Sequence, residues 1–411
     1  MRALIAIMFL MTSATMFGQT HPLILFYGDS LMTDKHAFID ISVIGALGSD
    51  HVNNSFIEKM YLGGHISDEE LDALVAESGE RNRAGMDARV GMQWWDLHTG
   101  LFGNECYRLM VSVQHENHAY AAYTDDLFKL GFRGNSDFVG KRVELAPLNM
   151  QYQAFQKFGV GVLDQSTYSR AQLSFVTGQD FISLDMNRAR MTTSSDLDSI
   201  SLFYHGDLIM ADPDKHGFGA GKGLGAALDL EWNLPMKDGE GWFGVAVYNL
   251  GFIRWNGATE HYDLDSTFYW TGVEINDLFD VEEDLTMPAL QDTIGYELRT
   301  GNQWQLMPMD VRMRMLRRLN ERIFIDAGIA LQPYQQSIPE LRVAVGQDWN
   351  GKVMLTEQIS YGGYSGFRAG VHVRTQLGAG FIVQAGTDNV PGWISSRARG
   401  RDLVFGISRI F

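Results

Sequence analysis

The chain has 411 residues, of which 45% are hydrophobic and 20% charged, and its net charge is −17. No apolar run after the N-terminus approaches the roughly eighteen residues that a spanning helix needs, which excludes a helical membrane protein. The negative charge argues against nucleic acid as a partner, because no basic surface is available to release counterions from phosphates. The 44 glycines, 24 Phe, 15 Tyr and 9 Trp suit a large sheet with aromatic belts and tight turns.

The N-terminus predicts a cleaved export signal. Met1–Arg2 is a short basic segment, Ala3–Met11 an apolar core and Thr12–Gly18 a run of small residues. We place the signal peptide at residues 1–18 and a single domain at residues 19–411. The apolar core is too short to serve as a retained anchor.

The first part of the mature chain predicts one strand and one short helix. The strand lies within Lys35–Leu47, whose centre reads AFIDISVI. Ser67 and Glu70 have the spacing of a capping box, and apolar residues follow at helical spacing, which predicts a helix of about ten residues within residues 50–83. This segment is either a surface loop with a helix or a plug over the mouth of a barrel.

Alternation of apolar and polar residues dominates from Met86 onward, and Gly366–Leu377 shows it most clearly. In a soluble sandwich the apolar rows would face a core. The opposite rows are charged, however, and several tryptophans lie near strand ends, which favours a barrel whose apolar face contacts lipid. The charged rows supply our candidates for the lining of a lumen, which are Arg312, Arg314, Asp326, Arg342, Arg368, His372 and Arg374.

The predicted fold class is therefore all-β: a transmembrane antiparallel up-and-down β-barrel of about 14–16 strands, with long extracellular loops and a short helix near the N-terminus. Turns near Asn320, Asn350 and Gly378 fall on the periplasmic side if the chain ends there. The longest connections, among them an acidic loop predicted for Ala258–Gly301, then lie outside the cell.

The last strand, Arg401–Phe411, explains how such a barrel closes. Apolar residues alternate along it and the chain ends on an aromatic residue. We expect it to pair with Ala379–Thr387 on one side and with the strand near Ala37–Ile44 on the other, which leaves no open edge in lipid. Phe411 is the candidate residue for barrel closure.

Three further motifs give only weak support for catalysis, phosphate binding or metal binding. Phe26–Leu31 resembles the nucleophile block of GDSL-type esterases through Ser30, but none of the histidines has an Asp three residues before it to form the usual base segment. The glycines at every second position of Gly217–Gly225 fit one face of a strand better than a phosphate loop. His115 and His118 are interpreted as exposed loop histidines rather than metal ligands.

The order of these parts resembles the DUF5723 outer-membrane proteins of Bacteroidota, which are similar to FadL-type and PorV-type barrels. The resemblance rests on HAFIDISVI, FIEKMYLGGHISDEELDALV, GNSDFVGK, YNLGFIRWNG, AGTDNV and the terminal aromatic residue. It implies a barrel in the outer membrane, and recognition of Phe411 by the barrel-assembly machinery. One departure is that Leu31–Asp34 replaces the Asn-Pro-Ala segment common near the N-terminus of FadL-like proteins, which puts a FadL-type plug in doubt.

These observations lead to a non-enzymatic barrel without cofactor or metal, located in the outer membrane and in contact with its lipid. The leading hypothesis is passage of small or hydrophobic solutes, with residues 50–83 and Ala258–Gly301 gating the outside. The alternative is a scaffold or accessory barrel for secretion or surface assembly, and an outer-membrane hydrolase using Ser30 is a third. Neither the solute nor the oligomeric state follows from the sequence.

Overall fold

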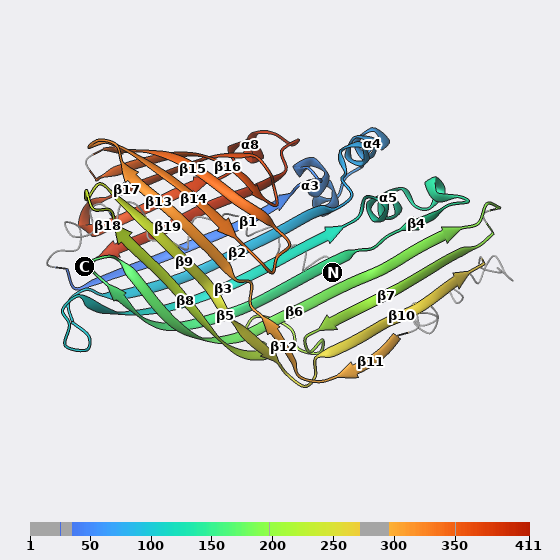
Figure 1. The fold of residues 1–411 in the computed structure, drawn as a ribbon, viewed down its shortest axis with the longest axis horizontal. Helices are drawn as coiled ribbons and strands as arrows, with labels where there is room; N and C mark the ends of the chain where they lie inside the picture. The colour runs from blue at the N-terminus through green and yellow to red at the C-terminus, as the bar shows by residue number, and fades with distance from the viewer. Residues whose placement is uncertain (1–24, 26–34, 197, 272–295, 350) are drawn as a thin grey trace.

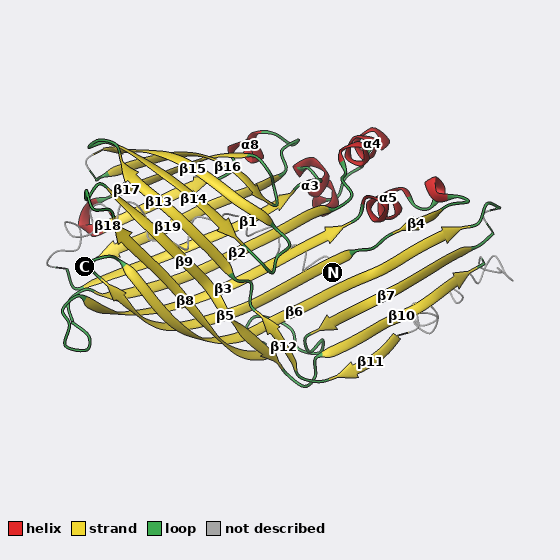
Figure 2. Ribbon diagram, in the orientation of Figure 1, coloured by secondary structure: helices red, strands yellow, loops and turns green. Residues whose placement is uncertain are grey.

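The computed structural model describes residues 25, 35–196, 198–271, 296–349 and 351–411. The predicted export signal and the block around Ser30 lie outside these residues. Antiparallel strands make up most of the described chain (Figures 1 and 2). No helix in the described ranges is long and apolar enough to cross a membrane.

Among the described residues, fourteen strands form a closed antiparallel ring. The ring strands, in order, are β1 (Ala37–Ser49), β2 (Asn82–Asp96), β3 (Tyr107–Tyr123), β5 (Leu148–Asp164), β6 (Ser169–Thr193), β8 (Gly223–Pro235), β9 (Gly241–Trp255), β13 (Asp310–Arg318), β14 (Ile323–Leu331), β15 (Ile338–Trp349), β16 (Val353–Gly363), β17 (Arg368–Gln376), β18 (Phe381–Thr387) and β19 (Gly400–Ile410). The predicted all-β barrel is confirmed, at the lower end of the expected strand number.

The ring closes between its first and last strands, as the sequence predicted. Strand β19 pairs with β1 from Phe38 opposite Ile410 to Gly48 opposite Gly400, and it pairs with β18 on its other edge. The backbone N–H of Phe411 donates to the carbonyl oxygen of Ala37 at 2.9 Å. Paired backbone groups at this seam leave no free edge between the two strands.

The strands separate an apolar outer surface from a polar interior. Exposed large apolar side chains alternate along the ring strands, for example Val43, Leu173 and Phe405. The positions between them are buried and carry many polar or charged side chains, including Lys157 and Asp326. An apolar belt around a polar interior is the arrangement that a lipid-embedded barrel requires.

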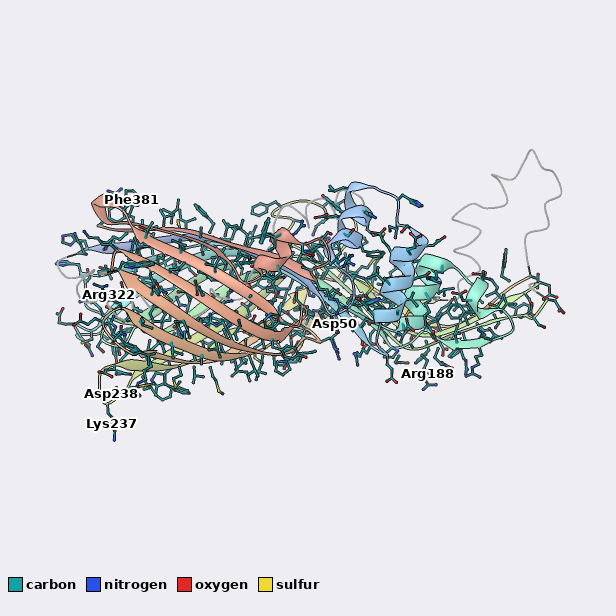
Figure 3. All side chains as sticks on the ribbon, turned by 90° about the horizontal axis from the view of Figure 1, so that it is seen from above. Asp50, Arg188, Lys237, Asp238, Arg322 and Phe381 are labelled. Atoms are coloured by element: carbon teal, nitrogen blue, oxygen red, sulfur yellow. The ribbon has the colours of Figure 1, made fainter. Side chains whose placement is uncertain are left out.

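The two ends of the barrel differ. At one end, here named the turn end, short connections join β5 to β6, β8 to β9, β13 to β14, β15 to β16 and β17 to β18, and the chain ends there. Figure 3 labels Phe381, Arg322 and Asp238 at this end, whereas Arg188 lies far beyond Asp50 toward the other end. That opposite end, the loop end, carries the longer connections.

The barrel wall continues beyond the ring at the loop end. The first half of β6 pairs with β8, and its second half pairs with β7 (Ile200–Met210), which pairs in turn with β10 (Glu260–Trp270) and through it with β11 (Tyr296–Thr300). Two short strands, β4 (Arg142–Glu144) and β12 (Gln303–Leu306), pair with β6 and β9. We name the sheet of β7, β10, β11 and the second half of β6 the sheet extension.

The prediction of a single acidic loop at Ala258–Gly301 was wrong, because β10 and β11 of the sheet extension lie within these residues. Acidic residues alternate with apolar ones along β10, and Leu264 and Phe268 pack against a buried cluster that contains Tyr204 of β7 and Phe138. A sheet that packs on one face needs apolar residues at only a few positions. The many acidic residues around these positions made the stretch look like a loop in the sequence.

Helices gather at the loop end. They are α3 (Asn54–Leu62), α4 (Asp68–Glu77), α5 (Asp125–Arg133) and α8 (Val390–Ile394), with one-turn 3₁₀ segments at Ser136–Phe138 and Gly378–Gly380. The segment 50–83 thus contains two helices where the sequence predicted one. The capping box is confirmed: Ser67 Oγ accepts from the N–H of Glu70, whose carboxylate accepts from the N–H of Ser67.

The glycine-rich stretch before β8 is mostly a loop, so its assignment to one face of a strand was wrong. Gly217, Gly219 and Gly221 have positive φ values of 93°, 85° and 57°, and β8 begins only at Gly223. Such backbone angles suit glycine in a turn and interrupt an extended strand.

Candidate functional site in the barrel interior

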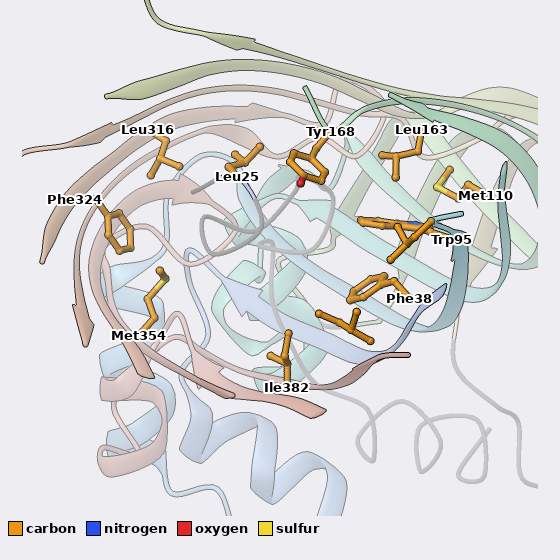
Figure 4. Close-up of a cluster of buried hydrophobic side chains, with 12 residues drawn as sticks. Leu25, Phe38, Trp95, Met110, Leu163, Tyr168, Leu316, Phe324, Met354 and Ile382 are labelled. Atoms are coloured by element: carbon orange, nitrogen blue, oxygen red, sulfur yellow. The ribbon is translucent and has the colours of Figure 1, made fainter. Parts of the chain in front are cut away.

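A ring of apolar side chains lines the interior near the turn end (Figure 4). Buried side chains from most ring strands meet there, and we name them the turn-end apolar layer: Leu25, Phe38, Trp95, Leu97, Met110, Leu163, Tyr168, Leu316, Phe324, Met354, Ile382 and Ile410. Phe38 and Trp95 lie with ring centroids 4.5 Å apart. Inward apolar residues at the same height on successive strands produce this layer, which lies between the polar interior and the turn end.

A network of buried charges occupies the interior between the two ends, and Lys157 of β5 is its centre. The ammonium group donates to Asp229 Oδ2 at 2.7 Å and to Asn249 Oδ1 at 2.6 Å, and it lies 3.6 Å from Glu116 Oε1. The Lys157 side chain is only 2% exposed. Charges buried this deeply are stable only when they are paired and hydrogen-bonded, and this network provides both.

His118 of β3 joins two carboxylates in the same network. Its Nδ1 lies 2.5 Å from Asp87 Oδ1 and its Nε2 lies 3.0 Å from Glu116 Oε2. Only a doubly protonated imidazole donates to both carboxylates. The expectation of an exposed loop histidine is therefore wrong for His118, which is buried within a strand, and His115 also lies within β3, on the opposite face.

Two small cavities lie within this polar interior. The larger one, of about 60 Å³, borders Arg89, Glu116, Lys157, Arg170 and Asp229 among others. The smaller one, of about 20 Å³, also borders Arg89, which pairs with Glu116 at 3.1 Å. Volumes of this size hold a few water molecules at most.

The seven predicted lining residues all lie on the inner face, and the structure pairs six of them with carboxylates or bases. The pairs are Arg312 with Asp310, Arg314 with Asp326 at 2.9 Å, Arg342 with Asp326 at 3.1 Å, Arg368 with Glu340 at 2.6 Å and His372 with Asp388 at 2.6 Å. Arg374 is the exception. The side chain is buried, and no hydrogen bond or ion pair reaches it from the described residues.

Three helices, α3, α4 and α5, pack together at the loop end, and we name them the helical cover. Phe56 of α3, Leu71 and Leu74 of α4 and Phe128 of α5 pack together with Val52. A second apolar cluster, centred on Phe155, Phe181, Ile253 and Trp255, lies where β6 changes partner from β8 to β7. The charged interior thus lies between the turn-end apolar layer and these clusters.

His51 fastens this helical cover to the barrel. Its Nδ1 lies 3.0 Å from the Tyr123 hydroxyl of β3, and its Nε2 lies 2.9 Å from the carbonyl oxygen of Leu74 in α4. Burial lowers the pKa of His51 below its usual value of 6.5, because the charged imidazolium is poorly solvated there. The neutral ring therefore connects α4 to the wall.

The sequence reasoning missed the centre of the charge network. Lys157, Asp229 and Glu231 were not singled out, although the alternation of β5 and β8 places them on the polar face. Asn249 of β9 is buried next to a register shift between β8 and β9, which alternation does not predict. The same alternation in β3 places His118 inward with Glu116. Strand parity thus predicts which side chains point inward, whereas their pairing depends on the strand register.

Chemically, the interior offers charge pairing and hydrogen bonding. Within the described ranges, no group of His, Cys, Asp and Glu side chains has the arrangement of a metal site. Cys106 is a free thiol on the surface at the turn end. The arrangement is suited to holding water and polar solutes by hydrogen bonds.

Comparison with solved structures returns outer-membrane barrels. The crystal structure of the Pseudomonas putida toluene transporter TodX is 8% identical, with 97% of this chain and 94% of that chain covered and a TM-score of 0.40. A TodX mutant described as a monoaromatic hydrocarbon channel is 9% identical, with 97% and 96% covered and a TM-score of 0.46. The translocator domain of the autotransporter NalP from Neisseria meningitidis is 8% identical, with 93% and 92% covered and a TM-score of 0.32.

No curated protein matches the chain. The profile of a family described as "Family of unknown function (DUF5723)" matches residues 31–388, which is most of the chain. The sequence motifs and the barrel agree with that match, and the chain belongs to the DUF5723 family.

Proposed function

We propose that the protein is an outer-membrane barrel that passes small polar solutes and that it is closed in the conformation described here. The observation that carries this proposal is a closed ring with an apolar exterior and a charged interior that contains cavities. The inward polar side chains of such a barrel can line a water-filled path across the membrane.

The interior favours polar solutes over hydrophobic ones. Arg89, Glu116, Lys157, Arg170 and Asp229 border the larger cavity, and an apolar molecule in that place would remove water from these charges without replacing its hydrogen bonds. A small polar solute replaces those hydrogen bonds. Of the small or hydrophobic solutes that the sequence suggests, we therefore propose the small polar ones.

We assign the closed conformation to two features: the turn-end apolar layer at one end and the packed helices α3, α4 and α5 at the other. We place the turn end in the periplasm and the loop end outside the cell, with the export signal removed and the apolar belt in contact with lipid. The helices of residues 50–83 then act as the outer gate.

Reconstitution tests the proposal. Purified protein in planar bilayers and in liposomes is compared with a variant that lacks residues 54–77, which include α3 and α4. We expect low, intermittent conductance and slow uptake of a small sugar for the intact protein, and a marked increase for the variant. If both proteins are folded and neither conducts ions in bilayers nor takes up the sugar in liposomes, the proposal is overturned.

A second function, a scaffold for secretion or surface assembly, is favoured by a separate observation. Most interior arginines are paired with carboxylates, and the sheet extension projects beyond the ring at the loop end. Co-purification of a stoichiometric partner from the native membrane, and its loss on removal of residues 272–295, would support this function. Unchanged recovery of the partner would argue against that segment as its binding site.

A further inference from the structure

Arg374 differs from four other interior arginines, Arg89, Arg170, Arg314 and Arg368, because no carboxylate of the described residues contacts it. Arg89, Arg170, Arg314 and Arg368 each lie between 2.6 and 3.1 Å from a carboxylate oxygen. Arg374 is only 4% exposed, its Nε is buried without a partner, and no ion pair joins it to the described residues. A buried guanidinium without a partner is costly, so its presence needs an explanation.

The nearby carboxylate does not provide that partner. Asp40 of β1 is close enough to attract the Arg374 charge, but its two oxygens accept hydrogen bonds from Ser408 at 2.6 Å and from Gln93 at 3.4 Å. Neither oxygen forms a hydrogen bond with Arg374. The guanidinium therefore retains its donors for another acceptor.

The position of Arg374 places it at a boundary inside the barrel. It follows Arg368 and His372 along the inner face of β17, toward the turn end. On β16 it is paired with Met354, which belongs to the turn-end apolar layer. On β18 it is paired with Gln384, and two residues before Gln384 lies Ile382, another member of that layer. The free guanidinium thus adjoins the apolar layer, at the last basic position of a basic row.

We propose that Arg374 is a binding site for the carboxylate group of a small organic anion, whose apolar part contacts Met354 and Ile382. The planar guanidinium presents parallel donors that match a carboxylate, and the adjacent apolar layer accommodates a short hydrocarbon portion. This inference rests on the proposed function and names a substrate class for it: small carboxylates that enter along the basic row of β17.

A stability measurement tests the site without requiring transport. Thermal unfolding is followed in detergent for the wild type, Arg374→Gln and the control Arg314→Gln, with sodium butyrate, sodium acetate or sodium chloride. In chloride, we expect Arg374→Gln to unfold at the same or a higher temperature than the wild type, because it removes an unpaired buried charge. Arg314→Gln should unfold at a lower temperature, because it leaves Asp326 less well paired.

Ligand dependence completes this test. Butyrate should raise the unfolding temperature of the wild type more than acetate, and acetate more than chloride, whereas Arg374→Gln should lose the carboxylate effect. Arg374→Lys keeps the charge without the parallel donors and should bind butyrate about tenfold more weakly. Equal responses of the wild type and Arg374→Gln to butyrate would overturn the site, as would a loss of stability in chloride as large as that of Arg314→Gln.

Conductance then separates this inference from the proposed function. Reversal potentials in a butyrate gradient should show anion preference for the wild type and its reduction in Arg374→Gln, with Arg317→Gln at the turn-end surface as a control that leaves it unchanged. If both the wild type and Arg374→Gln conduct with the same ion selectivity, the Arg374 binding site is overturned and the proposed passage of solutes stands. No conductance in any protein, together with the expected thermal response, would retain the site and reject transport.

Discussion

At the scale of single residues, Lys157 is the position at which the interior is most sensitive to change. It neutralises Asp229 and lies beside Glu116, and all three side chains are buried. We predict that Lys157→Met lowers the free energy of unfolding by about 3–5 kcal/mol, because it leaves buried carboxylates without their counter-charge. Guanidinium unfolding in detergent micelles, followed by tryptophan fluorescence, measures the change.

A double variant controls for the packing of the lysine side chain. Lys157→Met combined with Asp229→Asn removes one of the stranded charges, so it should recover part of the lost stability. If the double variant is as unstable as the sum of its single changes, charge pairing does not account for the effect.

Gly85 shows a steric limit within the same interior. A Cβ atom at this position would lie 2.0 Å from Cε2 of Tyr364, whose hydroxyl donates to the carbonyl oxygen of Gln335. We predict that Gly85→Ala displaces the ring and costs about 1–3 kcal/mol of stability, measured by the same unfolding experiment.

Gly91 offers the matched control, because it lies on the same strand and the same face. There the new Cβ would approach Cγ of Gln114 at 3.0 Å, and this flexible side chain can move away. Gly91→Ala should therefore cost clearly less than Gly85→Ala. Equal costs would show that the Tyr364 contact is not the cause.

At the scale of elements, alternation predicted strands well wherever one face contacts lipid. Gly366–Leu377 was predicted as a strand, and β17 spans most of it. Strand β6 is a single strand, Ser169–Thr193, although Gly178-Gln179-Asp180 within it has the composition of a turn. The strand passes through a register shift at Gln179, opposite Ala154 and Phe155 of β5, and on its other edge its partner changes from β8 to β7. That exchange depends on tertiary pairing, which local sequence does not encode.

The helical cover is the element for which we predict a dependence on pH. His51 has a lowered pKa in the folded protein, so the unfolded or undocked segment binds a proton more readily. The contribution of His51 to docking is therefore fully present above its ordinary pKa of 6.5 and is lost as pH falls below it. Hydrogen exchange of the α4 amides, corrected for intrinsic rates, should show weaker protection at acidic pH.

His51→Gln provides the comparison for this experiment. Glutamine retains hydrogen-bonding groups and does not titrate, so protection of α4 in this variant should not change through the same pH interval. A parallel loss of protection in the wild type and His51→Gln would assign the effect to other groups.

At the scale of the whole molecule, the sequence predicts the barrel more completely than its interior. Strand parity identified the inward arginines, because alternation alone determines the side of the wall. It did not identify that Arg314 pairs with Asp326 of the next strand, or that Arg374 has no such partner. Those outcomes depend on the height of each residue in the ring, which the register of fourteen strands determines.

Closure of the ring is the property on which the whole barrel depends, and Phe411 completes it. Its N–H donates to Ala37 and its carbonyl oxygen accepts from the N–H of His36 at 2.8 Å. We predict that deletion of Phe411 lowers the amount of folded protein in the outer membrane, because it removes two backbone hydrogen bonds at the seam and the terminal aromatic residue. Heat-modifiable mobility on gels of membrane fractions measures the folded amount. Phe411→Tyr keeps both hydrogen bonds and the aromatic ring and should insert normally, whereas normal levels of the deletion variant would show that β1 and β19 close the ring without it.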